Sequence, residues 1–221
     1  MVTISQILHF MSHNTFYTTL LIILTITILS FFFKNLIYKI ICLFLAIVLP
    51  VVNVFTIHFL NAWFLNKYGI ESTAKIVSDV ETNSTLNDFY IHDYEALVKK
   101  QDGKYITTHF STTTAAIYPI SNAIHIPNLN TTFPVKYIVG FEKNIVILFD
   151  KSEEGKNLLR YKIQQPIETA RLKYETDKTN KEFIEGYLTA LKTYTKLYDD
   201  EQSMAYQEII VGLEREISQL K

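Results

Sequence analysis

Charged side chains are almost absent from the first 66 residues of this 221-residue chain. The only charged side chains in that segment are Lys34 and Lys39. Nearly all of the 21 Lys and Arg and the 22 Asp and Glu side chains of the chain follow it. Charged residues make up about a quarter of an ordinary soluble domain. The distribution therefore predicts a membrane segment over residues 1–66 joined to a soluble part, and it disfavours one uniform globular domain.

Two apolar runs within this segment, at residues 16–33 and 40–62, predict a pair of transmembrane helices. Each run is long enough, at about 1.5 Å per residue, to cross a hydrocarbon core of about 30 Å with its flanks. Residues 34–39 leave room only for a tight turn, so we expect a helical hairpin after an N-terminal tail. A cleaved signal peptide is the alternative, and it is disfavoured because no Lys or Arg precedes the first run.

The lysines predict which way this hairpin crosses the membrane. Lys34 and Lys39 lie in the turn, and residues 1–15 contain no Lys or Arg. Loops rich in Lys and Arg stay on the cytoplasmic side of a membrane. The turn is therefore expected inside, with the N-terminus and the soluble part outside.

Polar residues and a proline mark one face of the second run. Ala46, Pro50, Asn53 and Asn61 recur there at helical spacing. Pro50 should bend the helix, and an asparagine inside a membrane needs a hydrogen-bond partner. We interpret this face as a transmembrane packing surface, used within the hairpin or in a homo-oligomer. A conduction path is the alternative, and two helices per chain could form one only in an oligomer.

Residues 67–150 contain short runs rich in Ile, Val, Thr, Tyr and Phe, which predict a β-rich domain. Turn signals separate the runs at Asn83-Ser84, Asp102-Gly103, Pro127-Asn128 and Gly140. An Asp-Gly pair between such runs is a particularly strong hairpin signal. About five or six strands of this kind predict a small antiparallel barrel or sandwich.

One part of the chain, roughly residues 67–157, resembles a widespread family of bacterial membrane proteins. The resemblance is carried by a Val-x-Tyr motif followed by an Asp-x-Ser-x-x-Gly turn, matched here by Val135, Tyr137, Asp150, Ser152 and Gly155. It implies a small β-domain beside transmembrane helices. It implies no activity and no catalytic residues.

Residues 151–221 are predicted to form a helical C-terminal region, arranged as a helical hairpin of two or three helices. Ser152 can cap a short helix, and Pro166 is expected to open a longer one because a helix tolerates proline in its first turn. Thr179 or Asn180 is expected to cap the next helix. Aromatic side chains with a polar tip are common at protein interfaces, which makes four tyrosines candidate partner-binding residues: Tyr174, Tyr187, Tyr194 and Tyr198.

No pattern in the sequence indicates catalysis, and we expect no catalytic, cofactor-binding or metal-binding residues. The single cysteine, Cys42, excludes an intramolecular disulfide and a cysteine-based zinc site. Only six glycines are present, which argues against phosphate-binding loops, and a net charge of −1 gives no reason to expect nucleic acid. Three histidines of the β-rich domain, His92, His109 and His125, would form a site only if the fold brought them together.

The fold class predicted is thus a membrane α + β protein, with a transmembrane hairpin, a β-domain and helices. Its expected location is a bacterial inner membrane, multi-pass, with the soluble domain in the periplasm. The expected function is non-enzymatic: the anchored domain binds a protein partner, as an immunity or accessory protein would. The alternative is a subunit of a membrane assembly or transport complex that acts through its transmembrane helices.

Overall fold

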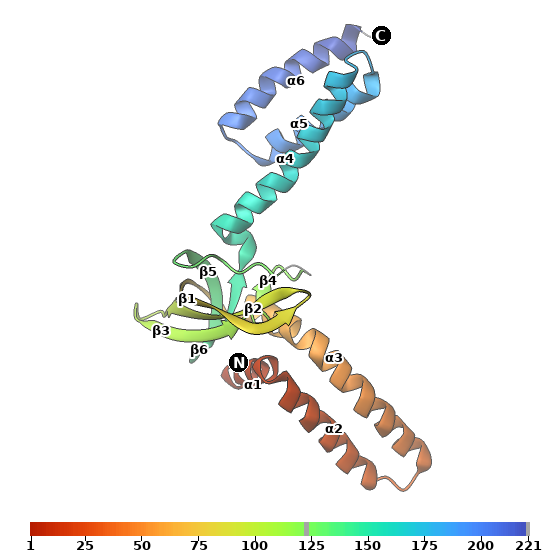
Figure 1. The fold of residues 1–221 in the computed structure, drawn as a ribbon, viewed down its shortest axis with the longest axis vertical. Coiled ribbons are helices and arrows are strands. Elements are labelled where there is room, and N and C mark those ends of the chain that lie inside the picture. The colour runs from red at the N-terminus through yellow and green to blue at the C-terminus, as the bar shows by residue number, and fades with distance from the viewer. Residues whose placement is uncertain (122–123, 220–221) are drawn as a thin grey trace. The chain divides into compact units, whose positions relative to one another are not determined.

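The computed structural model describes residues 1–121 and 124–219, in six helices and a six-stranded sheet (Figure 1). The chain forms two compact units, Met1–Glu154 and Gly155–Lys221. The first unit contains the apolar helices and the whole sheet. The second contains nearly all of the helical C-terminal region.

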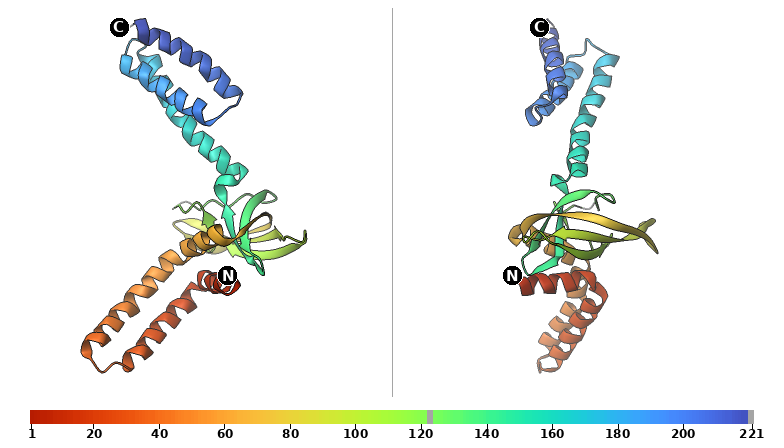
Figure 2. Two further views of the ribbon diagram at one scale, coloured as in Figure 1. Left: turned by 180° about the vertical axis from the view of Figure 1, so that it is seen from behind. Right: turned by 90° about the vertical axis from the view of Figure 1, so that its left-hand side faces the viewer.

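Three helices precede the sheet: α1 (Val2–His13), α2 (Thr15–Phe31) and α3 (Leu36–Tyr68). The expected N-terminal tail is therefore mostly the helix α1, which is bent by 104° from α2. α2 and α3 pack side by side and are joined by a short turn (Figures 1 and 2). Among the described residues, α3 is the one helix long and apolar enough by itself to cross a membrane, and α1 and α2 pass that test only when counted together.

α3 has two parts with different surroundings. Its 33 residues span about 50 Å at 1.5 Å per residue, which exceeds a hydrocarbon core of about 30 Å. Up to Thr56 most of its large side chains are exposed, whereas Ile57, Ala62, Phe64 and Leu65 are buried against the sheet. The apolar run predicted as one span therefore ends inside the β-domain.

The strands are β1 (Ile70–Leu86), β2 (Phe89–Lys99), β3 (Tyr105–Ser111), β4 (Ile117–Tyr118), β5 (Thr132–Ile138) and β6 (Phe141–Leu148). Their order in the sheet is β3-β2-β1-β5-β6-β4. The sheet is mixed, because β4 runs parallel to β6, so the expectation of purely antiparallel pairing is wrong. β4 is short because Pro119, which follows it, has no N–H to continue the ladder.

The predicted barrel or sandwich is not confirmed. In the strand order β3 and β4 are the two edges. The sheet nevertheless curls, which brings β3 close to β6. The Thr108 hydroxyl of β3 donates a hydrogen bond to the Lys143 carbonyl of β6. One buried cluster lies inside this curl, and it includes Ile76, Val98 and Phe133.

The turns follow the sequence signals in two places and differ in a third. The Asp102-Gly103 turn joins β2 and β3, and Gly140 joins β5 and β6, with φ of 82° at Gly103 and 92° at Gly140. The turn expected at Asn83-Ser84 is wrong, because β1 continues to Leu86. The chain turns instead at Asn87 and Asp88, with φ of 51° and 67°. Asn and Asp tolerate this left-handed region better than other side chains do.

The second unit holds α4 (Glu153–Thr176), α5 (Lys181–Leu197) and α6 (Glu201–Gln219). Pro166 lies inside α4, so the prediction that a helix begins there is wrong. α4 begins earlier because Glu153 and Glu154 favour its first turn, and one proline removes only one hydrogen bond from a long helix. The predicted cap at Asn180 is confirmed, since its side chain accepts hydrogen bonds from the Glu182 and Phe183 amides.

Candidate functional site

Exposed apolar side chains cover the outer surface of α2 and of the first part of α3. No Asp, Glu, Lys or Arg lies between residues 14 and 66 except Lys34 and Lys39, near the turn. Helices that are apolar on nearly all sides belong in a core or in a lipid bilayer. The exposed side chains come from both helices and include Leu20, Leu24, Ile28, Phe31, Ile37, Ile41, Phe44, Ile47, Val51 and Phe55.

Aromatic and basic side chains gather at the end of α3 that meets the sheet. The Lys67 ammonium lies 4.9 Å from the ring centroid of Trp63 and 5.3 Å from that of Tyr68. The two rings contact each other edge to face. Trp, Tyr and Lys in this combination are typical of the boundary between a bilayer and water.

The four residues of the predicted packing face lie on the inner side of α3, where they serve two different contacts. Pro50 and Asn53 are buried against α2, and Ala46 is half-buried. The Asn53 amide donates a hydrogen bond of 3.3 Å to the Thr18 hydroxyl of α2. Asn61 lies beyond the hairpin, where its partner is in the sheet.

A buried polar junction connects α1, α3 and β6. The side chains of Asn61 and Asn144 form a reciprocal amide pair, with N···O distances of 3.0 and 2.9 Å. The Asn144 amide also donates to the carbonyl and hydroxyl oxygens of Ser5, at 3.1 and 3.0 Å. Asn144, Asn61 and Ser5 are each at most 2% exposed. The junction therefore fixes α1 against the β-domain.

Two histidines of α1, His9 and His13, lie beside this junction, with ring centroids 3.9 Å apart. The pKa of His9 is lowered to about 4, mainly by burial and also by the neighbouring His13 and Lys143, while a hydrogen bond with Asn144 partly opposes the shift. His9 Nδ1 and His13 Nε2 are buried and have no hydrogen-bond partner among the described residues. Sequence reasoning missed this pair, although a spacing of four residues places two histidines on one helix face.

The three histidines of the β-rich domain lie in different surroundings. His92 Nδ1 is 2.6 Å from the Asp79 carboxylate, and His125 stacks on Phe149 with ring centroids 4.6 Å apart. His109 instead lines a small cavity next to His9 and His13. Within residues 1–121 and 124–219, no three His, Cys, Asp or Glu side chains form a group that could hold a metal ion.

The tyrosines predicted to bind a partner lie in the core of the second unit. Tyr187 is 5% exposed and Tyr194 is fully buried, while Tyr174 and Tyr198 are partly buried against the same cluster. Their polar tips are used internally, since the hydroxyl of Tyr174 donates to Glu216 and that of Tyr194 donates to Asp200. The exposed surface of this unit is therefore made mainly by other residues.

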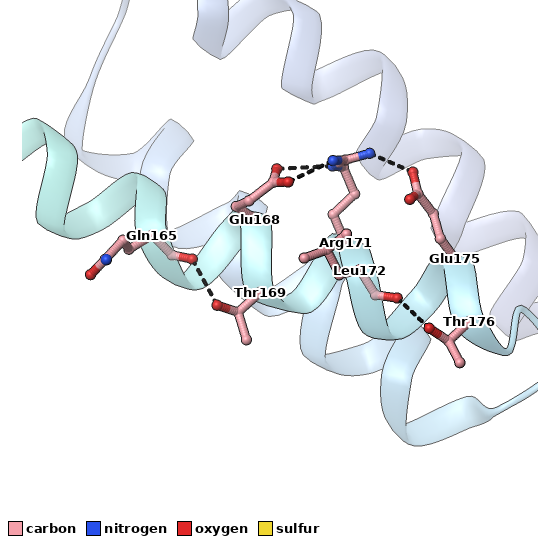
Figure 3. Close-up of polar contacts among 7 residues, drawn as sticks. All are labelled: Gln165, Glu168, Thr169, Arg171, Leu172, Glu175 and Thr176. Atoms are coloured by element: carbon pink, nitrogen blue, oxygen red, sulfur yellow. Dashed lines mark hydrogen bonds and ion pairs between the residues drawn. The ribbon is translucent and has the colours of Figure 1, made fainter.

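One side of α4 carries a network of charged side chains on the surface of this unit. The Arg171 guanidinium lies between the carboxylates of Glu168 and Glu175, one helical turn to each side (Figure 3). Thr169 and Thr176 return their hydroxyls to carbonyls four residues earlier. Exposed ion pairs of this kind add little stability, so they mainly keep this face soluble.

Comparison of the chain with protein-family models, with curated proteins and with solved structures finds no match. No family model supports the resemblance of residues 67–157 to a membrane-protein family.

Proposed function

We propose that this chain is a membrane-anchored accessory protein whose extramembrane units bind a protein partner without catalysing a reaction. The observation that carries the proposal is the apolar exterior of α2 and the first part of α3. Exposure of so much apolar surface to water on two long helices would be unfavourable. In this proposal α2 and residues 36–56 of α3 are the two spans. At 1.5 Å per residue they cover about 26 Å and about 32 Å.

The packing of α1 supports two crossings over one. α1 precedes α2 and contacts β6 through Ser5, while α3 enters the same sheet at its C-terminal end. Both ends of the hairpin therefore lie beside the β-domain, as an even number of crossings requires. The lysine-containing turn would then face the cytoplasm, and the β-domain the periplasm of a bacterial cell.

Several polar side chains of the first unit are used for contacts within the chain. Asn61 and Asn144 bond to each other, and His92 pairs with Asp79. The transport-complex alternative is disfavoured because Asn53, its main polar residue inside the membrane, bonds to Thr18 of the same chain. The polar face of α3 is thus used within the chain, which leaves it without an evident role in an oligomer.

Alkaline carbonate extraction of membranes that contain the full chain tests the anchor. We expect the protein to remain in the membrane pellet, as an integral protein does. A variant with Leu24→Arg and Phe44→Arg, two exposed positions of the hairpin, should be lost from the pellet because each arginine is costly in the hydrocarbon core. Release of the unaltered protein into the supernatant would overturn the anchor.

Photo-crosslinking in native membranes tests the partner. A photoreactive amino acid at Met204 or Leu159, both exposed in the second unit, should give a discrete adduct with another protein. The same amino acid at Leu191, which is fully buried in that unit, serves as the matched control. If no exposed position of the β-domain or of the second unit gave an adduct, partner binding would be contradicted.

A further inference from the structure

We propose that α1 lies in the plane of the membrane interface and that its exposed apolar face contacts lipid. This inference rests on the proposed anchor and extends it: the chain would then contact the bilayer with three helices, two crossing it and one lying on it. The exposed face of α1 would contact the bilayer where the lipid headgroups meet the acyl chains.

The exposed face of α1 carries large apolar side chains together with Thr3 and Gln6, while its buried face combines two serines with Leu8. Ser5 and Ser12 point inward and are 0% and 1% exposed. Ile4, Ile7 and Phe10 recur every three residues on the other face and are 48%, 53% and 52% exposed. A helix that buries serine and exposes isoleucine and phenylalanine is suited to an apolar environment outside the protein.

The orientation of α1 follows from the bend at Asn14. α1 and α2 make an angle of 104°, and transmembrane helices tilt by about 20° on average. If α2 crosses the bilayer, α1 must run close to the membrane plane. Figure 2 shows α1 lying across the end of the hairpin, between the hairpin and the sheet.

Exposed apolar side chains occur on both sides of the bend between α1 and the proposed anchor. Phe16 and Tyr17, the first exposed residues of α2, are 75% and 65% exposed. No Asp, Glu, Lys or Arg occurs anywhere in residues 1–33. No charge therefore separates the face of α1 from the face that the proposal places in lipid, and the same bilayer can cover both.

The polar junction holds α1 in this position. Asn144 binds the Ser5 carbonyl and hydroxyl groups, and Leu8 packs in the cluster that α3 forms with β6. The inner face is thereby occupied by the β-domain, which leaves the outer face to the membrane. The β-domain would thus rest on the bilayer through α1.

Site-directed spin labelling in vesicles of phosphatidylethanolamine and phosphatidylglycerol tests the inference. Single cysteines are placed at Ile7, at Leu24 as the lipid reference and at Tyr105 as the aqueous reference, in a Cys42→Ala background. Leu24 and Tyr105 are 54% and 61% exposed, so a label fits at either position. We expect the ratio of oxygen to nickel-complex accessibility at position 7 to be several-fold above that at position 105, and close to that at position 24.

The outcomes separate the inference from the anchor. A lipid-like ratio at 24 with a water-like ratio at 7 overturns the inference and leaves the anchor intact. Water-like ratios at both positions overturn both. Low accessibility to both reagents at 7, with dipolar broadening between labels, would show that a second copy covers α1, which also overturns the inference. Quenching of Phe10→Trp fluorescence by brominated lipid, in a Trp63→Phe background, gives an independent supporting readout.

Discussion

At the scale of single residues, Asn144 connects three elements of the first unit. Its side chain reaches α1 and α3 from β6 and makes its hydrogen bonds where almost no water can replace them. Replacing it with alanine leaves the Asn61 amide buried without its partner. We expect Asn144→Ala to lower the free energy of unfolding by about 1–3 kcal/mol, measured by thermal unfolding in detergent.

An exposed asparagine provides the matched control for this prediction. Asn83 lies on β1 with its side chain in solvent, so Asn83→Ala should change the stability by less than about 0.5 kcal/mol. Equal losses in the two variants would mean that the junction contributes no more than an ordinary surface position.

The lowered pKa of His9 should make the stability of the fold depend on pH. Its ordinary pKa is 6.5, and burial next to His13 and Lys143 lowers the folded-state pKa to about 4. Above pH 6.5 the ring is neutral in both states and its contribution to stability is complete. As the pH falls from about 6.5 to about 4, the unfolded chain binds the proton first, so stability decreases over that interval.

The variant His9→Gln should flatten this slope. Part of the slope should remain in this variant, because burial also lowers the pKa of His13. Glu71 pairs with Lys151, which lowers the Glu71 pKa below 4.5, so its effect belongs to more acidic solutions. Denaturation midpoints between pH 7 and pH 5 that fall equally in both proteins would show that His9 is not the cause.

The Asn53–Thr18 hydrogen bond can be measured by a double-mutant cycle. We compare Asn53→Leu, Thr18→Val and the double variant by unfolding in mixed detergent micelles. Hydrogen bonds between helices in membranes contribute on the order of 0.6–1.7 kcal/mol, which is the coupling we expect. Because the bond lies within one chain, Asn53→Leu should leave the oligomeric state unchanged in light scattering. Additive effects, or dissociation of an oligomer, would contradict this assignment.

At the scale of elements, the sequence predicts periodicity better than it predicts where an element ends. The Asp102-Gly103 turn is identifiable because glycine is needed at a φ of 82°. The turn after β1 is not, because Asn83-Ser84 and Asn87-Asp88 carry similar signals and only the pairing with β2 distinguishes them. β1 keeps Asn83 and Ser84 in an irregular stretch, where its register against β2 shifts between Glu81 and Thr85.

α1 and α3 show a second limit of sequence reasoning. The apolar run of α3 continues into the β-domain, since a core and a lipid bilayer select the same side chains. The boundary near Ile57 therefore depends on tertiary packing that hydropathy does not record. In α1 the buried face combines Ser5 and Ser12 with Leu8, so the hydrophobic pattern alone gives no reason to expect that Ser5 and His9 meet a distant Asn144.

Pro166 lies within α4, where replacing it should stabilise the helix. Proline inside a helix removes one hydrogen bond and costs about 3 kcal/mol relative to alanine. Pro166 is exposed, so Pro166→Ala removes little packing and should raise the stability of α4 by up to about 3 kcal/mol. Slower amide hydrogen exchange in residues 160–170 would record the gain. Thr169→Ala, one turn away on the exposed surface, is the control and should have little effect.

At the scale of the whole molecule, each of the two units has its own core. In Gly155–Lys221 the core includes Leu191 and Tyr194, whereas in Met1–Glu154 it lies in the sheet and beneath α1. The long helices that are almost free of charged side chains, α2 and α3, belong to the first unit. The two units therefore divide the proposed work, with the first holding the membrane and the second presenting a soluble helical surface to a partner.

The two proposed crossings predict the accessibility of the chain to reagents that cannot pass a membrane. In a Cys42→Ala background, a cysteine at Asn35, in the turn, and one at Tyr105, in the β-domain, should lie on opposite sides. Because positive charge remains on the cytoplasmic side, a charged maleimide added to intact cells should label position 105 and not position 35. Opening the cells should expose both positions. Labelling of both in intact cells would argue against a membrane between them, and labelling of 35 alone would reverse the orientation while keeping the hairpin.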